Sequence, residues 1–264
     1  MVSASAEVSI PRFDERLVVG TVAEVIRKWQ ALTFDTDGVL IHDCARIEGL
    51  RLLRGRHHQK DAQYRVVSTP KETTADETPA PIVLTLLAAG HDKLAFQVGL
   101  DELGSASFAI ENPARPGKLT GSLETELGDD GGRFMRGPMC VGAAVDLTAI
   151  PSKSPRSAQA VAQLEHRRAT ASAEVSIAQP NSREWVVRVT AKVRGGGFLR
   201  PIVGIASPFI RGLFRRELQK SMDKLPLWIA EQKFGTPTPT ELAERGFDEF
   251  IAGLARVVPS DALS

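Results

Sequence analysis

The sequence contains only two cysteines, Cys44 and Cys140, among its 264 residues. Cysteines so far apart have neither the spacing of a zinc site nor that of a disulfide framework. Long apolar runs are also missing, because no stretch approaches the ~20 residues that a helix needs to cross a bilayer. The first residues show no basic leader followed by an apolar core. These absences favour a reduced, intracellular protein, cytoplasmic by default, without a metal site.

An excess of one charge is missing as well. Lys and Arg number 33, against 32 for Asp and Glu. A chain so balanced has no overall basic field to attract a polyanion, so we expect no nucleic-acid partner. The apolar share of 42% and the charged share of 25% are ordinary for a globular protein. A chain of this length can bury a sizeable core in one large or two small domains.

Short alternating segments dominate the chain from residue 94 onward, and Gly, Pro, Asn or Asp interrupt them. The clearest hairpin covers residues 170–193, where two alternating segments flank the connection QPNSRE. Strands that follow one another without helices favour an antiparallel sheet. The heptad ASAEVSI occurs at residues 4–10 and again at 171–177. Because the flanking sequences differ, we interpret the heptads as two similar strands of one sheet.

Helical spacing occurs in three segments. Residues 21–32 place Val22, Val25, Ile26 and Trp29 on one face, and residues 208–225 carry the longest apolar stripe in the sequence. After a linker rich in Pro and Thr, the tail predicts one more short helix, with Thr240 as its N-cap. Residues 69–81 are rich in Pro, Thr and acidic residues, which is typical of a surface insertion.

The segment WVVRVTAKVRGGGFLRPIVGIASPFIRGLFRRELQKSMDKLPLWIAE combines a strand, a Gly-rich turn and an Arg-rich helix. It resembles the closing segment of the START-like (Bet v 1, polyketide-cyclase-like, SRPBCC) superfamily. The resemblance implies an α+β fold in which a curved antiparallel sheet packs on a long C-terminal helix. The domain would cover residues 1–235 with the insertion at 69–81, and residues 236–264 would form a linker and a short helix.

That resemblance also implies a cavity between sheet and helix, which would bind or transport a hydrophobic small molecule or lipid without a cofactor. The protein would then be a binding protein rather than an enzyme. The predicted ligand-binding residues are the apolar stripe of the helix: Phe209, Leu213, Phe214, Leu218, Met222 and Leu225. The Arg-rich face of the same helix has two interpretations: a solvated polar face, which is the more usual case, or peripheral contact with anionic lipid headgroups through Arg211, Arg215 and Arg216.

The stretch ALTFDTDGVLIHD, residues 31–43, offers a different function. Its Asp-x-Asp-Gly pattern resembles the nucleophile loop of haloacid-dehalogenase-type phosphatases, which implies Asp35 as nucleophile, Asp37 as acid and base, and Mg²⁺ held by both. The same residues suit a hairpin turn, with Gly38 at positive φ and Asp35 bonding nearby backbone. The phosphatase needs a parallel sheet, which the strand-rich second half does not favour. We therefore prefer the hairpin.

Two adjacent histidines have no obvious partner in the sequence. His57 and His58 lie in the basic run RLLRGRHHQK, and we interpret them as part of a solvated face.

The third functional alternative is a structural or interaction domain with a solid core, since a helix with an apolar stripe that packs on a sheet is stable without any ligand.

Overall fold

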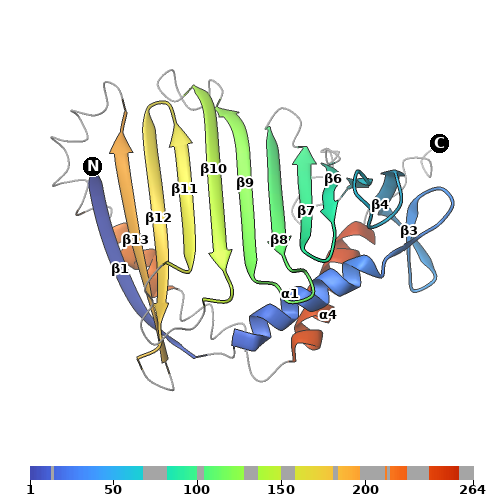
Figure 1. Cartoon of the computed structure of the whole chain (residues 1–264), viewed down its shortest axis with the longest axis horizontal. Coiled ribbons are helices and arrows are strands. Elements are labelled where there is room, and N and C mark those ends of the chain that lie inside the picture. The colour runs from blue at the N-terminus through green and yellow to red at the C-terminus, as the bar shows by residue number, and fades with distance from the viewer. Residues whose placement is uncertain are drawn as a thin grey trace. The chain divides into compact units, whose positions relative to one another are not determined.

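The structure is a computed structural model, and it describes residues 1–12, 15–67, 82–99, 104–127, 136–149, 158–180, 184–196, 212, 215–224 and 238–255. Antiparallel sheet dominates these ranges and comprises thirteen strands (Figure 1). The chain forms two compact units. The first consists of Met1–Arg16 and Gly117–Thr236, and the second of Leu17–Pro116 and Pro237–Ser264. The predicted division at residue 235 stays a prediction, and the predicted insertion at 69–81 lies outside the described residues.

Six strands make up the sheet of the first unit. They are β1 (Val2–Pro11), β9 (Lys118–Leu127), β10 (Gly137–Asp146), β11 (Ala160–His166), β12 (Ala169–Ala178) and β13 (Glu184–Gly195). Their order is β1-β13-β12-β11-β10-β9, so the first strand lies beside the last. The pairing of β12 with β13 confirms the predicted hairpin.

The repeated heptad lies in β1 and β12, on the two sides of β13. Ala4 pairs with Ala191, whereas Ala173 of the second copy pairs with the same residue from the other side. The interpretation of two similar strands in one sheet is therefore confirmed. β13 pairs with a similar sequence on each side, because both copies of the heptad present the same alternation of apolar and polar residues to it.

A small core covers one face of this sheet. Its buried members come from β1, β13 and a helical segment at residues 215–223: Ala6, Ile10, Trp185, Val187 and Met222. Leu218 packs against them from the same segment. The side-chain amide of Gln219 also donates to the Glu7 carbonyl over 3.2 Å. The segment is thereby fixed to β1.

The second unit contains seven strands and two helices. They are α1 (Glu15–Gln30), β2 (Thr33–Phe34), β3 (Val39–His42), β4 (Ala45–Arg54), β5 (Gln63–Val66), β6 (Ile82–Ala89), β7 (Lys93–Gly99), β8 (Ser105–Glu111) and α4 (Pro239–Ala255). The strands follow one another as an antiparallel meander in the order β8-β7-β6-β5-β4-β3-β2. The predicted helix at 21–32 is α1, and Ile26 is buried there as expected, whereas Val25 is exposed.

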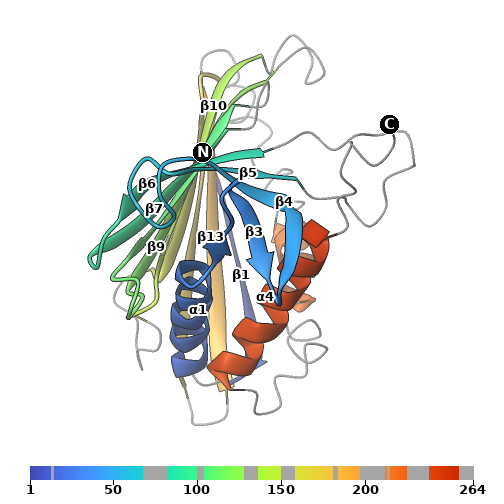
Figure 2. The same cartoon turned by 90° about the vertical axis from the view of Figure 1, so that its right-hand side faces the viewer.

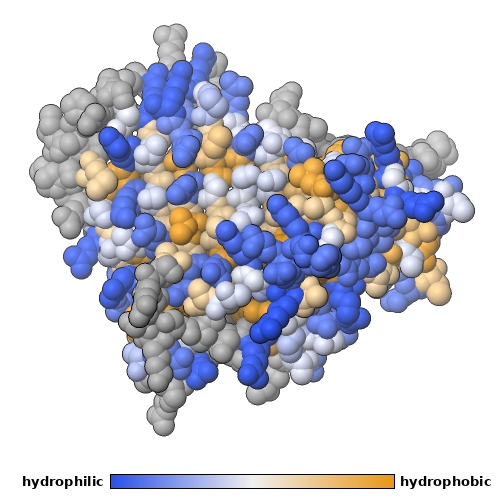
Figure 3. Space-filling model, in the orientation of Figure 1, coloured by the Kyte–Doolittle hydropathy of each residue, from blue (hydrophilic) through white to orange (hydrophobic). Residues whose placement is uncertain are grey.

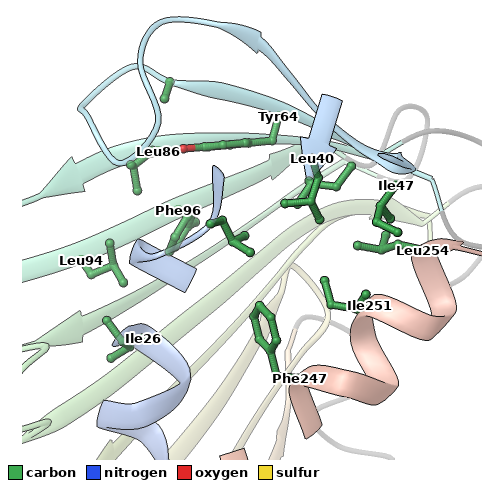
Figure 4. Close-up of a cluster of buried hydrophobic side chains, with 13 residues drawn as sticks. Ile26, Leu40, Ile47, Tyr64, Leu86, Leu94, Phe96, Phe247, Ile251 and Leu254 are labelled. Carbon is green, nitrogen blue, oxygen red and sulfur yellow. The ribbon is translucent and has the colours of Figure 1, made fainter. Parts of the chain in front are cut away.

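Both helices contribute to the core of the second unit. Figure 4 shows Ile26 of α1 and Phe247, Ile251 and Leu254 of α4 facing the apolar side chains of the strands. The helices lie side by side (Figure 2), and Lys28 of α1 reaches α4. Its Nζ lies 3.7 Å from Glu244 Oε1 and 5.8 Å from the centre of the Phe247 ring. Large side chains, among them Leu50, Tyr64 and Leu86, are fully buried in this core.

The beginning of α4 corrects one prediction. Thr238, not Thr240, is the N-cap: the Glu241 N–H donates to Thr238 Oγ1 over 3.2 Å. The Glu241 carboxylate in turn accepts from the Thr238 N–H over 2.7 Å, which completes a capping box. Pro239 occupies the first helical position, where its missing N–H costs nothing. The predicted cap was wrong because Pro239 and Thr240 already have helical backbone.

The predicted fold class is wrong. Sheet dominates the described residues, and their helices are three short segments: α1, residues 215–223 and α4. A long C-terminal helix packed on the sheet is not what the described residues form. The physical reason is that residues 45–66 and 82–89, for which no strand was predicted, add β4, β5 and β6, which pair locally. Their apolar side chains pack against two shorter helices, α1 and α4, so no single long helix is needed to cover them.

Among the described residues, no helix is long and apolar enough to cross a membrane. Figure 3 shows hydrophobic residues scattered among hydrophilic ones over the face in view.

Candidate functional site

The acidic turn at residues 35–38 is the tip of a hairpin. Thr33 pairs with Ile41 and Phe34 with Leu40 in antiparallel register, which confirms the preferred prediction. Asp35 Oδ1 accepts hydrogen bonds from the backbone N–H groups of Asp37 (2.9 Å) and Val39 (2.8 Å). Gly38 has φ 77°, in the left-handed region that glycine adopts without strain. Asp35 thus shapes the turn.

The phosphatase hypothesis needs free carboxylates at the end of a parallel strand. Instead, Arg46 Nη1 lies 3.1 Å from Asp35 Oδ2 and 3.4 Å from Asp37 Oδ2. The strand before the turn is two residues long and antiparallel to the next. Within the described ranges, no group of three or more His, Cys, Asp or Glu side chains is placed to hold a metal ion. The geometry is that of a braced turn, because each carboxylate already has a structural partner.

One face of the sheet in the first unit is apolar on every strand. Side chains of alternate residues point to the same face, and the registers of the paired strands identify the residues that lie side by side. The face that carries Trp185 and Val187 is the one against which Met222 packs. Its neighbours in β9 to β12 are Leu, Val, Ile, Ala, Gly and Met near the strand centres. The opposite face carries Ser, Thr, Glu, Lys and Arg on most strands.

A row of small residues crosses this apolar face. Successive pairings connect Gly121, Ala143, Ala162, Ala173, Ala191 and Ala4, one residue from each of the six strands. The row on one side of it contains Leu123, Val141, Leu164, Ala171, Val193 and Val2. The row on the other side contains Leu119, Val145, Ala160, Val175, Val189 and Ala6. Methyl groups and a hydrogen project less than the Leu and Val side chains that dominate the flanking rows, so this small-residue row carries the smallest side chains of the face.

Burial changes along the small-residue row. Ala4 and Ala191 are buried, Ala162 and Ala173 are partly buried, and Ala143 is exposed. The row is therefore buried at its β1 end and most exposed at Ala143, and Gly121 at its β9 end is partly buried. Exposed alanine next to partly exposed Val and Leu is apolar surface that gains free energy when a ligand covers it.

Two of the predicted ligand-binding residues lie on this same apolar face. Leu218 and Met222 pack in the core that contains Val187, which lies two rows from the small-residue row. Phe209, Leu213, Phe214 and Leu225 lie outside the residues whose side chains are described, so their predicted role stays a prediction. Arg215 and Arg216 are exposed on the helical segment, and Arg211 lies outside the described residues.

A hydrogen-bonded network around His57 occupies the second unit. His57 Nε2 lies 3.0 Å from the Trp29 carbonyl, which can only accept, so Nε2 carries the proton of the neutral ring. Its Nδ1 then accepts from the Tyr64 hydroxyl over 3.0 Å, and that hydroxyl oxygen accepts from the His58 N–H over 3.1 Å. Burial raises the pKa of Tyr64, which keeps the hydroxyl protonated as a donor. The network ties the end of α1 to the turn before β5.

This network corrects the interpretation of His57 and His58 as a solvated face. Both rings are partly buried, and His57 lies among aromatic rings, with centroids 5.7 Å from Trp29 and 5.0 Å from Phe34. His58 adopts φ 56°, a backbone conformation that no spacing pattern reveals. The only sequence signal was their place after Gly55, which also has positive φ and marks a tight turn.

A pocket of about 460 Å³ lies beside α1. Its lining includes Ile26, Arg27, Gln30 and His58. The polar groups are already paired: Arg27 Nη2 lies 2.7 Å from Glu24 Oε2, and Gln30 Nε2 lies 3.2 Å from His58 Nε2. Nothing in this lining combines a nucleophile with a base, so the pocket is a weaker candidate than the apolar face.

The His57 network predicts that stability falls in acid. Burial, the largest cause, lowers the pKa of both His57 and His58 from the ordinary value of 6.5. The unfolded chain then binds more protons than the folded one between the folded pKa and 6.5. Their contribution to stability is complete above pH 6.5 and is lost as the pH falls through the folded pKa. Urea unfolding at pH 7.5 and 5.5 measures it.

His57→Gln cannot be protonated and should make the change in unfolding free energy between these two pH values smaller than in the wild type. His91→Gln is the control, because the His91 side chain is 93% exposed and lies outside the network. An equal pH dependence in wild type and His57→Gln would contradict the prediction.

Comparisons with known proteins leave the family open. No family model matches the chain, and no curated protein matches it. Solved structures that match include the di-domain ARO/CYC BexL from the BE-7585A biosynthetic pathway, with 8% identity over 98% of this chain and 100% of that one. DynU16, from the dynemicin biosynthetic locus, is 12% identical over 93% of this chain and 99% of that one. The TM-scores are 0.19 and 0.17, too low to carry an argument about fold or ligand.

Proposed function

We propose that the first unit binds a hydrophobic small molecule or lipid on the apolar face of its sheet, beside the helical segment at 215–223. The observation that carries this proposal is the small-residue row, which crosses a face that has no polar side chain at its centre. An apolar body fits such a face, because each CH₂ group that it covers contributes up to about 0.8 kcal/mol.

The alternative of a solid structural core explains these residues less well. A packed sheet face is filled by interlocking large side chains, as in the second unit, where Tyr64, Leu50 and Leu86 are fully buried. The first unit instead places Gly121, Ala143 and Ala162 in adjacent strands and leaves Ala143 exposed. Exposed apolar surface beside a closed core is typical of a ligand-binding face.

Membrane contact belongs to the same proposal. Arg215 and Arg216 are exposed on the segment that packs over the apolar face through Leu218 and Met222. Guanidinium groups so placed can contact anionic headgroups while the segment stays fixed to the sheet, which suits a protein that takes up a lipid from a membrane surface.

A series of neutral alcohols tests the proposal. We expect 1-octanol, 1-decanol and 1-dodecanol to displace an apolar fluorophore with affinities that rise by about fourfold for each added CH₂, which corresponds to about 0.8 kcal/mol. Calorimetry should give a negative heat-capacity change, since apolar surface is buried. Binding that does not depend on chain length, or no binding by any of the three, would refute the proposal.

A further inference from the structure

β1 is the terminal strand of the sheet in the first unit, and its sequence lacks the features that protect an exposed sheet edge (Figure 1). Such features are a short strand, a bulge, a lysine or an internal proline. β1 is ten residues long and pairs with β13 from Val2 to Pro11 without a shift in register. Its one charged side chain is that of Glu7, and Arg188 Nη2 already lies 2.6 Å from this carboxylate. A long, straight edge of this kind can pair with a further strand.

The hydrogen bonds of the neighbouring strands show which backbone groups of β1 point away from the sheet. In an antiparallel pair, opposite residues alternate between those that exchange hydrogen bonds and those that do not. The Gly196 N–H donates to the Arg168 carbonyl, so even-numbered residues of β13 bond to β12 and odd-numbered ones to β1. The odd-numbered residues of β13 lie opposite even-numbered residues of β1. The backbone N–H and C=O groups that point outward are therefore those of Ser3, Ser5, Glu7 and Ser9.

One side chain of the described residues reaches this outer edge. The amide of Gln219 donates to the Glu7 carbonyl over 3.2 Å, which agrees with the outward direction of that carbonyl. A carbonyl oxygen has two lone pairs, so the Glu7 carbonyl can accept a second hydrogen bond from a strand in the plane of the sheet. Within the described ranges, the outward backbone groups of Ser3, Ser5 and Ser9 have no hydrogen-bond partner. The edge is therefore available over most of the length of β1.

The repeated heptad shows that a strand of this sequence pairs well through the same edge. Residues 5, 7 and 9 of β1 correspond to residues 172, 174 and 176 of β12. These residues of β12 are the even-numbered ones, whose backbone groups bond to β13. The sequence Ser-x-Glu-x-Ser thus already forms an antiparallel ladder in β12 through the edge that β1 leaves open.

We infer that β1 is the interface through which two copies of the chain associate, with their β1 strands antiparallel to each other. The partner is a second copy because β1 complements itself: on both sides of Ala6, residues 2–10 alternate identically between apolar and polar. In the register centred on Ala6, Ser5 of one copy lies opposite Glu7 of the other, and Ala4 lies opposite Val8. Apolar side chains then meet apolar ones, and the two carboxylates do not face each other. The two strands exchange about eight backbone hydrogen bonds. This inference does not depend on the proposed function.

The test measures dimerisation of the full chain by sedimentation equilibrium. Ser5→Pro removes an outward N–H and keeps the ladder with β13, as proline does on an edge strand. A two-fold interface loses two hydrogen bonds at once. The dissociation constant of the dimer should therefore rise about thirtyfold, which corresponds to about 2 kcal/mol. Ser5→Ala is the matched control, because it keeps the N–H and loses only the hydroxyl, which lies 3.1 Å from Thr190 Oγ1. It should dimerise like the wild type.

Amide hydrogen exchange of the wild type gives a second measurement that needs no substitution. The Ser5 amide should exchange slowly in concentrated protein and quickly in dilute protein, whereas the Ala4 amide, which bonds to β13, should be protected in both. A wild type that stays monomeric up to about 1 mM, or a Ser5 amide with the same protection at both concentrations, would overturn the inference. A dimer that Ser5→Pro does not weaken, or that Ser5→Ala weakens equally, would overturn it as well. If Ser5→Pro loses the protection of Ala4, its fold is altered and the exchange of the wild type decides.

Discussion

Replacing Gly49 by alanine should lower the free energy of unfolding of the second unit by about 3 kcal/mol, at the upper end of the usual cost of overpacking. Gly49 is buried in β4, where the backbone of α4 crosses the strand. A Cβ there would meet the Leu254 carbonyl oxygen and would lie 2.8 Å from both Leu254 Cα and the Val67 carbonyl oxygen. These atoms are backbone on two sides, so no side-chain rotation relieves the clash.

Gly246→Ala is the matched control for Gly49→Ala. Gly246 lies in α4, and a Cβ on it would meet no atom within 4 Å. Alanine is favoured over glycine inside a helix, so this variant should gain about 0.5–1 kcal/mol. Urea unfolding followed by the fluorescence of Trp29, which packs against the same core, measures both variants. Equal stability of the two alanine variants would show that α4 does not approach β4 as closely as described.

The parts of the fold that the sequence predicts are those determined by neighbouring residues. The hairpin around Asp35 and Gly38 follows from turn chemistry, which acts over four residues. The helix that became α1 and the hairpin of β12 and β13 follow from apolar periods of 3.6 and 2. In each case the information lies within about twenty residues of sequence, so no knowledge of the rest of the chain is needed.

Pairing between strands that are far apart in the chain could not be predicted from such local patterns. Nothing local indicates that β1 pairs with β13, whose residues lie more than 170 positions away in the chain. The small-residue row depends on this register and on four between consecutive strands, and a shift of one strand by one residue would put its small residue on the opposite face. The alanines of separate strands can be recognised as one row only when the registers of the strands are known.

The same limit explains why the predicted ligand site was placed only on the helix. The apolar stripe of residues 208–225 is visible in the sequence, whereas its counterpart on the sheet is spread over six strands. Leu218 and Met222 pack in the core that contains Val187, and Ala143, Ala162 and Ala173 lie in the small-residue row of the same face. If a ligand covers this row, as we propose, it must compete with any side chain that fills the row.

Filling the small-residue row should abolish binding of a hydrophobic ligand. Ala143→Phe places a ring at the most exposed position of the row, where the substitution displaces no core residue. The ring occupies the space of several CH₂ groups, so the affinity for 1-dodecanol should fall at least a hundredfold, which corresponds to about 3 kcal/mol. Ala144→Phe is the matched control, because the next residue of β10 points to the opposite face. Fluorophore displacement measures both variants. If Ala144→Phe weakens binding as much as Ala143→Phe does, the ligand does not lie on this face. If both variants bind like the wild type, the ligand does not cover the small-residue row.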